Sequence, residues 1–341
     1  MRGNITLISK EKSSWKVRIE LPKDNQTGKR KQKCYTFYGK RKEAEKFLTE
    51  KLNELDKGLI TDTKQIKFSE YLDYWKDKTF KNLEVTTREG YIQKIEKHIK
   101  PYLGNIMLEK LKPLDLQNFY ERELEKGQLN GKGGLSARTV LAIHRIIHSA
   151  LQQAVKWELI IRNVAEAVEV PKAKKYQAKY LDDKQTEQLI KKAENTDIYI
   201  PIMIAIYTGA RRGEILGLNW ENVDFEKGII KIVDNLCATK DGLIIKQPKT
   251  NSGIRTIAIS KTLVRILKKH KIKQIQNKMR LGKIYQDNNM VCCYEDGHLF
   301  NPKRFSAKFH ELLLKNKLPI IRFHDLRHSH ASLLVKLGVQ P

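Results

Sequence analysis

Hydrophobic and polar residues alternate in the first part of the chain. Between residues 15 and 21 every second position is apolar and charged residues stand between them, which predicts a strand with one buried face. The pattern predicts a second strand over 34–38, beyond a polar and basic turn. Apolar residues then recur at helical spacing over 44–55, which indicates a helix with one buried side. We therefore expect a small sheet backed by a helix over residues 1–60.

The pattern becomes helical after a polar linker. Thr86 and Glu89 fit a capping box, and the helix that they open should end before Pro101. Ser136 is expected to cap a further, long helix with one apolar side. Because apolar stripes at this spacing are typical of packed helices, we interpret them as core rather than as a cofactor site. These features predict a compact helical domain over residues 67–170.

A basic stretch without an apolar stripe, residues 171–179, separates the helical part from the rest of the chain. Beyond it, segments with helical spacing alternate with short apolar runs that are typical of strands. The predicted strands lie at 229–233, 243–245 and 255–259. We expect a third domain of α+β type over residues 180–341. The whole is then a multidomain chain that is mainly α-helical with small β-sheets.

The most apolar run of the chain, Ile198 to Tyr207, is about half the length that a membrane-spanning helix needs. It is broken by Pro201, and we interpret it as a buried core element. No long apolar segment follows Met1, so no secretory signal is expected. The cysteines have the spacing of neither a zinc site nor a disulfide framework, which favours a reduced, cytoplasmic compartment. They are Cys34, Cys237, Cys292 and Cys293.

Charge narrows the range of partners. The 341 residues include 66 Lys and Arg but only 39 Asp and Glu, a net charge of +27, and 40% of them are hydrophobic. That hydrophobic content is enough for packed cores and excludes a basic disordered tail. A folded chain this basic is typical of a nucleic-acid-binding protein. A membrane-surface protein would concentrate its charge on one amphipathic helix, and an RNA-binding module would show aromatic stacking motifs; neither pattern is present.

Basic side chains of the first and second domains are candidates for contacts with DNA. A sheet of two or three strands can lie in the major groove, and Lys16 and Arg18 share the polar face of the first predicted strand. The alternative is that these residues form a solvated face. The candidates are Lys16, Arg18, Lys29, Arg30, Lys31, Arg138 and Arg145.

Three polar segments of the third domain could carry chemistry. In Thr-Gly-Ala-Arg, which ends at Arg211, a glycine turn opens a helix, so backbone N–H groups and this arginine could face a phosphate together. Lys249 stands near the tip of a polar turn between two strands. His-Asp-Leu-Arg begins a helix and places His324 and Arg327 on one face. Each segment is a weak signal in a chain with 66 basic residues.

In this order and context, Arg211, Lys249, His324 and Arg327 make the chain resemble the tyrosine site-specific recombinases. Within them it is similar to the integrases of temperate phages and conjugative transposons. The resemblance covers essentially the whole chain. The three predicted domains are similar, in order, to an arm-type DNA-binding domain, a helical core-binding domain and most of the catalytic domain.

The resemblance implies that DNA is cut and rejoined through a 3′-phosphotyrosyl intermediate with a free 5′-hydroxyl. Arg211 and Arg327 would each offer a planar pair of donors to the phosphorane oxygens. Lys249 would protonate the leaving 5′-oxygen, and His324 would donate to the phosphate or help to remove the nucleophile's proton. Glu214 would orient the pocket. Such a cationic pocket replaces a metal ion, so neither a metal nor another cofactor is expected.

The resemblance also implies a His or Trp and the nucleophilic tyrosine a few tens of residues beyond Arg327. The chain reaches Pro341 without a residue that matches either, and Tyr207, Tyr285 and Tyr294 lie in the wrong context. We therefore expect residues 1–341 to bind DNA but not to cleave it. Arg212 and His328, next to the candidates, are interpreted as structural or DNA-contacting.

Three functional hypotheses follow. The first is an enzyme of a bacterial cytoplasm that integrates or excises a mobile element. Its partners would be double-stranded attachment sites, further copies of itself in a tetramer, and DNA-bending accessory proteins. The second is a non-catalytic DNA-binding regulator or inactive remnant. The third is a type IB topoisomerase, which resembles the same catalytic fold, but the arm-like and helical domains favour recombination.

Overall fold

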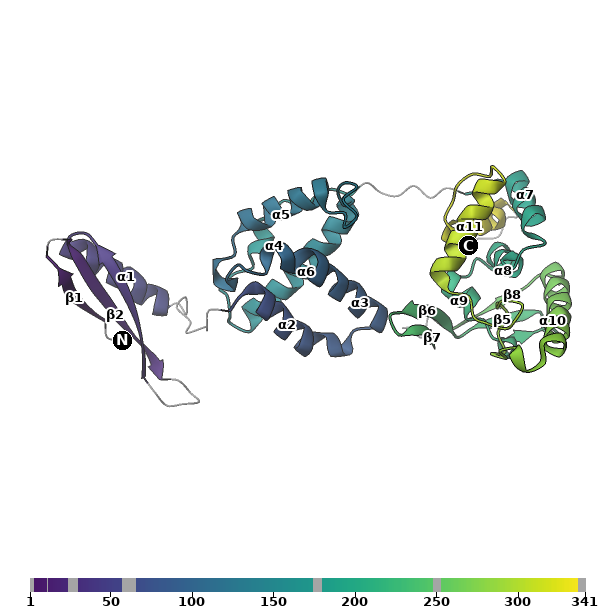
Figure 1. The fold of residues 1–341 in the computed structure, drawn as a ribbon, viewed down its shortest axis with the longest axis horizontal. Coiled ribbons are helices and arrows are strands. Elements are labelled where there is room, and N and C mark those ends of the chain that lie inside the picture. The colour runs from purple at the N-terminus through teal and green to yellow at the C-terminus, as the bar shows by residue number, and fades with distance from the viewer. Residues whose placement is uncertain are drawn as a thin grey trace. The chain divides into compact units, whose positions relative to one another are not determined.

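The computed structural model describes residues 3–10, 12–23, 30–56, 66–173, 180–247 and 253–336. The chain divides into two compact units, which are residues 1–83 with 90–174 and residues 84–89 with 175–341. Figure 1 shows the order of the elements, from the purple amino-terminal sheet to the yellow carboxyl-terminal helices. The architecture is mainly helical with small antiparallel sheets, as the sequence predicts.

The amino-terminal part forms an antiparallel sheet in the order β1-β2-β3, with a helix packed against it. Val17 and Ile19 are fully buried, and Tyr35, Leu48 and Leu52 pack around Ile19. The predicted sheet backed by a helix is thus confirmed. The bounds are β1 Gly3–Ser9, β2 Ser14–Lys23, β3 Arg30–Tyr38 and α1 Arg41–Asp56.

The sheet is larger than the alternation of side chains indicates. The pattern does not predict β1, and β2 and β3 continue into the expected turn as far as the pairing of Lys23 with Arg30. Strand pairing uses backbone N–H and C=O groups, so polar residues extend a ladder beyond its buried part. An apolar pattern therefore identifies only the part of a strand whose side chains are buried, and not the full length over which the strand is paired.

The helical part is organised around α6, whose apolar side is buried along its whole length. Ser136 caps this helix as predicted, since its Oγ accepts a hydrogen bond from the N–H of Thr139 at 3.2 Å. The buried stripes of α2, α5 and α6 form one core, as expected for packed helices. The bounds are α2 Phe68–Thr79, α3 Val85–Lys94, a π turn Ile95–Ile99, α4 Lys100–Leu103, α5 Pro113–Lys126 and α6 Ala137–Lys156, with short 3₁₀ turns at Phe80–Asn82, Leu108–Lys110 and Val164–Ala167.

Two predictions about α3 are wrong. The helix begins at Val85, so Thr86 lies inside its first turn rather than at its cap. The helical path also does not end before Pro101, which lies within α4. The π turn joins α3 to α4 without a break and changes the spacing of the backbone hydrogen bonds just before Pro101. The proline is therefore accommodated at an irregular point of the helical path.

The last unit contains a sheet in the order β4-β5-β8, a separate hairpin β6–β7 and six α-helices among its described residues. The three predicted strands correspond to β5, β7 and β8, while the pattern predicts neither β4 nor β6. The helices are α7 Asp183–Ala193, α8 Tyr199–Thr208, α9 Arg212–Leu216, α10 Lys261–Leu281, α11 Pro302–Lys315 and α12 Leu326–Lys336, with 3₁₀ turns Trp220–Asn222, Gly282–Ile284 and Phe323–Asp325. The strands are β4 Val223–Asp224, β5 Ile229–Ile232, β6 Asn235–Thr239, β7 Gly242–Lys246 and β8 Arg255–Ala258.

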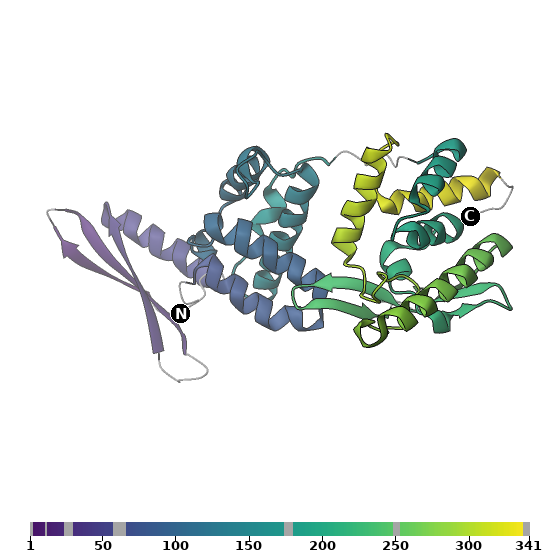
Figure 2. The same cartoon turned by 45° about the vertical axis from the view of Figure 1, so that its right-hand side comes forward.

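Helix α8 is the centre of this unit. It contacts α7, α9, α10 and α12, and α10 runs beside the β4-β5-β8 sheet in both ribbon views (Figures 1 and 2). The prediction of a buried core element is confirmed, but Pro201 does not break it. Pro201 is the third residue of α8, where its missing N–H would have no partner within the helix. Within the described residues, no helix combines the length and apolar character that crossing a bilayer needs.

Candidate functional site

The turn after α8 brings the first candidate segment into place. Gly209 ends α8 in the left-handed conformation, with φ +59°, which residues with a Cβ adopt only at a cost. Space is restricted as well, because a Cβ at this position would lie 2.6 Å from Cδ2 of His330. The Oγ1 of Thr208 accepts a hydrogen bond from the N–H of Ala210 at 3.2 Å, which closes the turn into α9.

Arg211 stands at the cap of α9 and is bound to Glu214 twice. Its backbone N–H donates to Oε2 of Glu214 at 2.8 Å, and its Nη1 donates to Oε1 at 2.9 Å. The side chain of Arg211 nevertheless remains 59% exposed. Its guanidinium is therefore oriented by Glu214 and still open to an anion from solvent.

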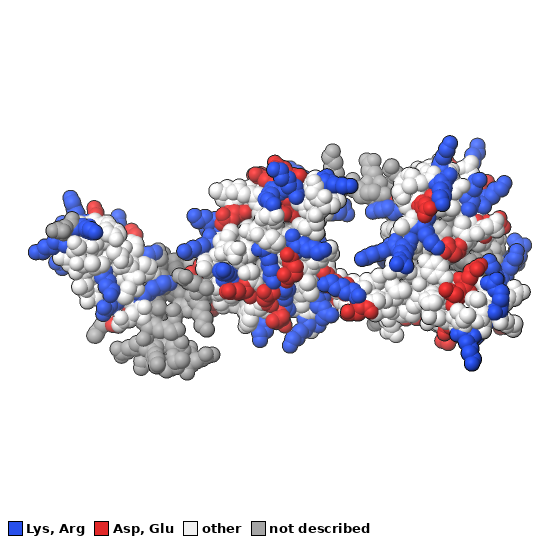
Figure 3. All heavy atoms as spheres, viewed as in Figure 1, with Lys and Arg blue, Asp and Glu red and all other residues white. Residues whose placement is uncertain are grey.

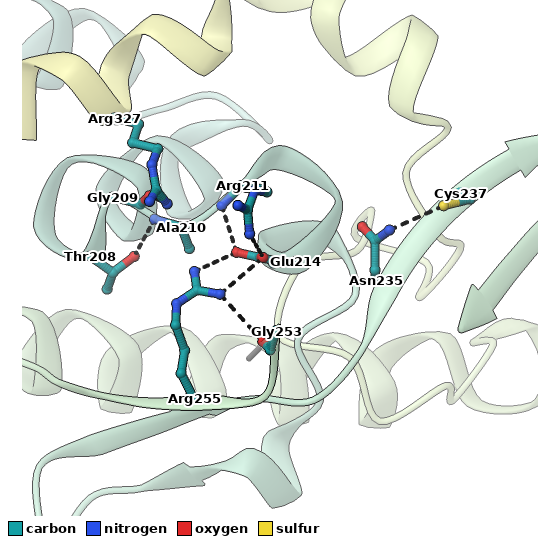
Figure 4. Close-up of polar contacts among 10 residues, drawn as sticks. All are labelled: Thr208, Gly209, Ala210, Arg211, Glu214, Asn235, Cys237, Gly253, Arg255 and Arg327. Atoms are coloured by element: carbon teal, nitrogen blue, oxygen red, sulfur yellow. Dashed lines mark hydrogen bonds and ion pairs between the residues drawn. The ribbon is translucent and has the colours of Figure 1, made fainter. Parts of the chain in front are cut away.

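Glu214 is the carboxylate at the centre of the site. Its side chain is 6% exposed, and Arg255 binds it through two hydrogen bonds of 3.0 and 2.6 Å (Figure 4). Burial by itself raises the pKa of a carboxyl group. Here the hydrogen bonds from Arg255 and Arg211 outweigh burial and hold the pKa of Glu214 at about 2. Glu214 is thus a permanent anion that fixes two guanidinium groups.

Arg327 reaches the same place from α12. Its Nη1 donates to the carbonyl oxygen of Gly209 at 2.7 Å. Burial lowers the pKa of Arg327, and so do the positive charges of Arg211 and Arg255, while Glu214 raises it. Three guanidinium groups therefore form one cluster, in which those of Arg211 and Arg255 bind Glu214 and that of Arg327 lies at the carbonyl of Gly209, as Figure 4 shows.

His324 lies beside Arg327 in the 3₁₀ turn Phe323–Asp325 and is exposed. Partial burial lowers its pKa first, and the neighbouring His328 and Arg327 lower it further. The turn itself is fixed by Asp325, which is fully buried and accepts hydrogen bonds from Arg322. A largely neutral imidazole is thus held on a rigid turn next to an arginine.

Some predicted residues lie outside this cluster. Lys249 and Lys29 fall outside the described residues, and only the backbone is described for Arg30 and Lys31, in β3. The other four predicted DNA contacts are exposed, two on the face of β2 opposite its buried residues and two on α6. They are Lys16, Arg18, Arg138 and Arg145. Figure 3 shows that Lys and Arg side chains are spread over the visible face of both units.

Arg212, Tyr285 and Tyr294 make structural contacts within this unit. Arg212 donates from Nη1 to Oγ of Ser306 on α11 at 2.6 Å, which ties α9 to α11. Tyr285 lies 3.9 Å from the sulfur of Cys293, and burial raises the pKa of its hydroxyl. Tyr294 packs on Phe300 with 4.4 Å between ring centres. In the part of the chain that the structure describes, no group of three or more His, Cys, Asp or Glu side chains could hold a metal ion.

Sequence reasoning does not single out Arg255. It stands at the end of the segment that contains Lys249 and is one of 66 basic residues. One signal is present, since the alternation over 255–259 places Arg255 on the same face of the strand as the apolar Ile257 and Ile259. A charged residue on the apolar face of a strand needs a partner of opposite charge when that face is buried.

Comparison with known proteins identifies the family. Three family models match in order, namely the arm DNA-binding domain over residues 5–55, the N-terminal SAM-like domain of phage integrases over 67–124 and the phage integrase family over 179–341. The chain belongs to the phage integrase family of tyrosine site-specific recombinases.

Individual relatives agree with this assignment. A XerC-like tyrosine recombinase of Caldanaerobacter subterraneus is 24% identical, and the alignment covers 99% of this chain and 90% of that protein. The ICEBs1 integrase of Bacillus subtilis is 27% identical over 75% of this chain and 69% of its own length.

Solved structures show the same fold. The Tn1549 transposon integrase, in complex with transposon right end DNA, has a TM-score of 0.65 at 22% identity and covers 80% of this chain and 87% of that one. A lambda integrase tetramer bound to a Holliday junction has a TM-score of 0.58 at 16% identity and covers 99% and 93%.

Proposed function

We propose that this protein integrates or excises a mobile element by cutting and rejoining DNA at attachment sites, with the arginine cluster around Glu214 as its phosphate-binding centre. One observation carries the proposal. Arg211, Arg255 and Arg327 carry three positive charges and Glu214 carries one negative charge, so these four side chains together keep a charge of +2. The carboxylate of Glu214 is buried. A pocket of this charge suits the pentacoordinate phosphorane of phosphoryl transfer.

In the proposed mechanism a tyrosine oxygen attacks the phosphorus atom, and the 5′-oxygen leaves to give a 3′-phosphotyrosyl bond. We assign the role of nucleophile to no tyrosine of residues 1–341 and propose that these residues bind DNA without cleaving it. Arg211 and Arg327 hold the non-bridging oxygens, since planar guanidinium groups donate in pairs to phosphate. Lys249 gives a proton to the leaving 5′-oxygen. His324 donates to the phosphate or takes up the proton of the nucleophile. The lowered pKa of His324 favours the second role, because a neutral imidazole can accept a proton. Glu214 orients Arg211.

The substrate that we propose is double-stranded DNA. The net charge of +27 supports it, as do the exposed basic residues Lys16 and Arg18 on the sheet and Arg138 and Arg145 on α6. Relatives are seen bound to DNA, one of them as a tetramer on a Holliday junction. We therefore propose tetramers on two duplexes, with DNA-bending proteins as accessory partners.

The test begins with binding. A preferred duplex is selected by residues 1–341 from a randomised library. Each of its phosphates is then replaced, one at a time, by an uncharged methylphosphonate. One phosphate per half-site should stand out, and its replacement should weaken binding roughly 10- to 100-fold, from the 1.5–3 kcal/mol of a hydrogen bond to a charged group.

The variant Arg211→Ala links that phosphate to the site. It should weaken binding of unmodified DNA by a similar factor, and the methylphosphonate at the critical position should then have no further effect. Arg265→Ala on α10 removes the same charge from an exposed position and should retain the dependence on the critical phosphate. Equal sensitivity at every phosphate, in wild type and Arg211→Ala alike, would refute the proposed phosphate site.

A further inference from the structure

Arg255 is held in a fixed place by the sheet and by Glu214. It is the first residue of β8 and pairs with Ile232 of β5. Its side chain is 27% exposed and points to the carboxylate of Glu214, as Figure 4 shows. Its two nitrogens bind both carboxylate oxygens, Nη2 to Oε2 at 2.6 Å and Nη1 to Oε1 at 3.0 Å.

Arg211 and Arg255 share one negative charge. Arg255 makes the two-pronged ion pair, while the side chain of Arg211 makes a single hydrogen bond of 2.9 Å to Glu214. Arg211 therefore keeps most of its donors unused by Glu214, and its side chain is the more exposed of the two, at 59% against 27%. A guanidinium that is only partly neutralised retains its attraction for a second anion.

We propose that Arg255 is a positioning residue of the phosphate site, which occupies Glu214 and so keeps the guanidinium of Arg211 available to a DNA phosphate. This inference rests on the proposed function, since it concerns the same site. Arg255 itself donates inward to a buried carboxylate and does not touch the phosphate.

The consequence of losing Arg255 follows from the geometry. Glu214 would remain as a buried carboxylate whose closest cation in the cluster is Arg211. A buried charge is costly without a close partner, so the guanidinium of Arg211 would close onto Glu214 and be lost to DNA. Removing the carboxylate as well would release Arg211 again.

A double-mutant cycle tests this competition. Affinity for the selected duplex is measured for wild type, Arg255→Gln, Glu214→Gln and the double variant. Arg255→Gln should weaken binding about tenfold, within the range of coupling between residues in contact. The double variant should bind within about threefold of wild type, because the carboxylate that captures Arg211 is gone.

Salt dependence gives a second readout. Loss of one phosphate contact lowers the slope of log K against log salt by about 0.9. The slope should fall in Arg255→Gln and return in the double variant. Arg265→Gln, which removes one charge from the exposed face of α10, is the matched control, and Glu214→Gln should not restore its affinity.

The outcomes separate the possible roles. If Arg255 contacted DNA directly, the double variant would bind as weakly as Arg255→Gln, which would overturn the proposal. A purely structural role would lower the melting temperature and leave the affinity of the folded protein unchanged, and this result would overturn the proposal as well. If Arg211→Ala also left affinity and slope unchanged, the proposed phosphate site itself would fail, and not only the part assigned to Arg255.

Arg255→Lys keeps the comparison available if Arg255→Gln does not fold. Lysine retains the charge but lacks the planar fork that binds both oxygens. We expect a loss of about threefold that Glu214→Gln reverses. No loss with lysine would show that the two-pronged contact has no part in keeping Arg211 available.

Discussion

Gly209 is the position where backbone conformation and packing limit the site together, so Gly209→Ala is the most informative single change. The left-handed φ of +59° costs a residue with a Cβ about 1–2 kcal/mol. The new methyl group would lie 2.6 Å from the ring of His330, and overpacking of this kind costs about 1–3 kcal/mol. The two contributions predict a loss of about 2–5 kcal/mol in the free energy of unfolding.

The His330 ring cannot move aside freely. Its Nδ1 donates to the carbonyl oxygen of Ile206 at 2.8 Å, so a shift would break a hydrogen bond between α12 and α8. Arg327 is on the same helix and donates to the carbonyl of Gly209. The substitution should therefore also displace Arg327 and weaken DNA binding.

Urea unfolding, followed by circular dichroism and fluorescence, measures the effect. The unit that contains α8 should unfold at lower urea in Gly209→Ala, while the unit that contains α6 keeps its transition. In the double variant with His330→Ala the clash is absent, so the two losses should sum to about 1–3 kcal/mol more than the double variant shows. A loss below about 0.5 kcal/mol for Gly209→Ala, or simple additivity, would refute the steric argument.

Three further predictions concern charges and polar contacts. Glu214→Gln removes a carboxylate whose pKa is about 2 against an ordinary 4.5. Its contribution to stability is complete above pH 4.5 and is lost as the pH falls towards 2, so the stability difference from wild type in denaturation curves should close over that range. In the helical core Nδ1 of His98 lies 2.6 Å from Oε2 of Glu123, whose side chain is 1% exposed. His98→Ala should cost about 1–3 kcal/mol in urea unfolding, because it leaves a buried polar group without this hydrogen bond, and a loss below about 0.5 kcal/mol would contradict this. Arg212→Ala should lower the melting temperature by removing the bond to Ser306, with little change in DNA affinity for the folded protein.

Local pattern determined much of the fold. The alternation around Val17 and the helical stripe of α6 identify faces that are indeed buried, because burial is imposed residue by residue along a strand or helix. Ser136 also caps α6 as expected, since a cap depends on three neighbouring residues. Strand β1 escapes prediction because its short apolar pattern of Ile5 and Leu7 is too brief to stand out and none of its residues is fully buried; its pairing with β2 uses backbone groups.

The prolines also show that the local pattern does not determine where a helix begins. Pro101 and Pro201 are unfavourable in a helix interior, yet Pro201 lies in the first turn of α8 and Pro101 lies just after the π turn that joins α3 to α4. Whether a proline interrupts a helix depends on where the helix begins, and that is set by packing. The local pattern leaves this boundary open by several residues.

The candidate site divides in the same way. Order and context in the sequence single out Arg211, Glu214 and Arg327, but nothing local to them indicates that Arg255 completes the cluster. The hydrogen bond from Arg327 to Gly209 joins residues 118 positions apart, and the one from Arg255 to Glu214 spans 41. The sequence by itself determined which segments carry the charged residues and which faces are buried. Only the tertiary structure decided which arginines share one carboxylate, because that depends on how β8 lies against α9.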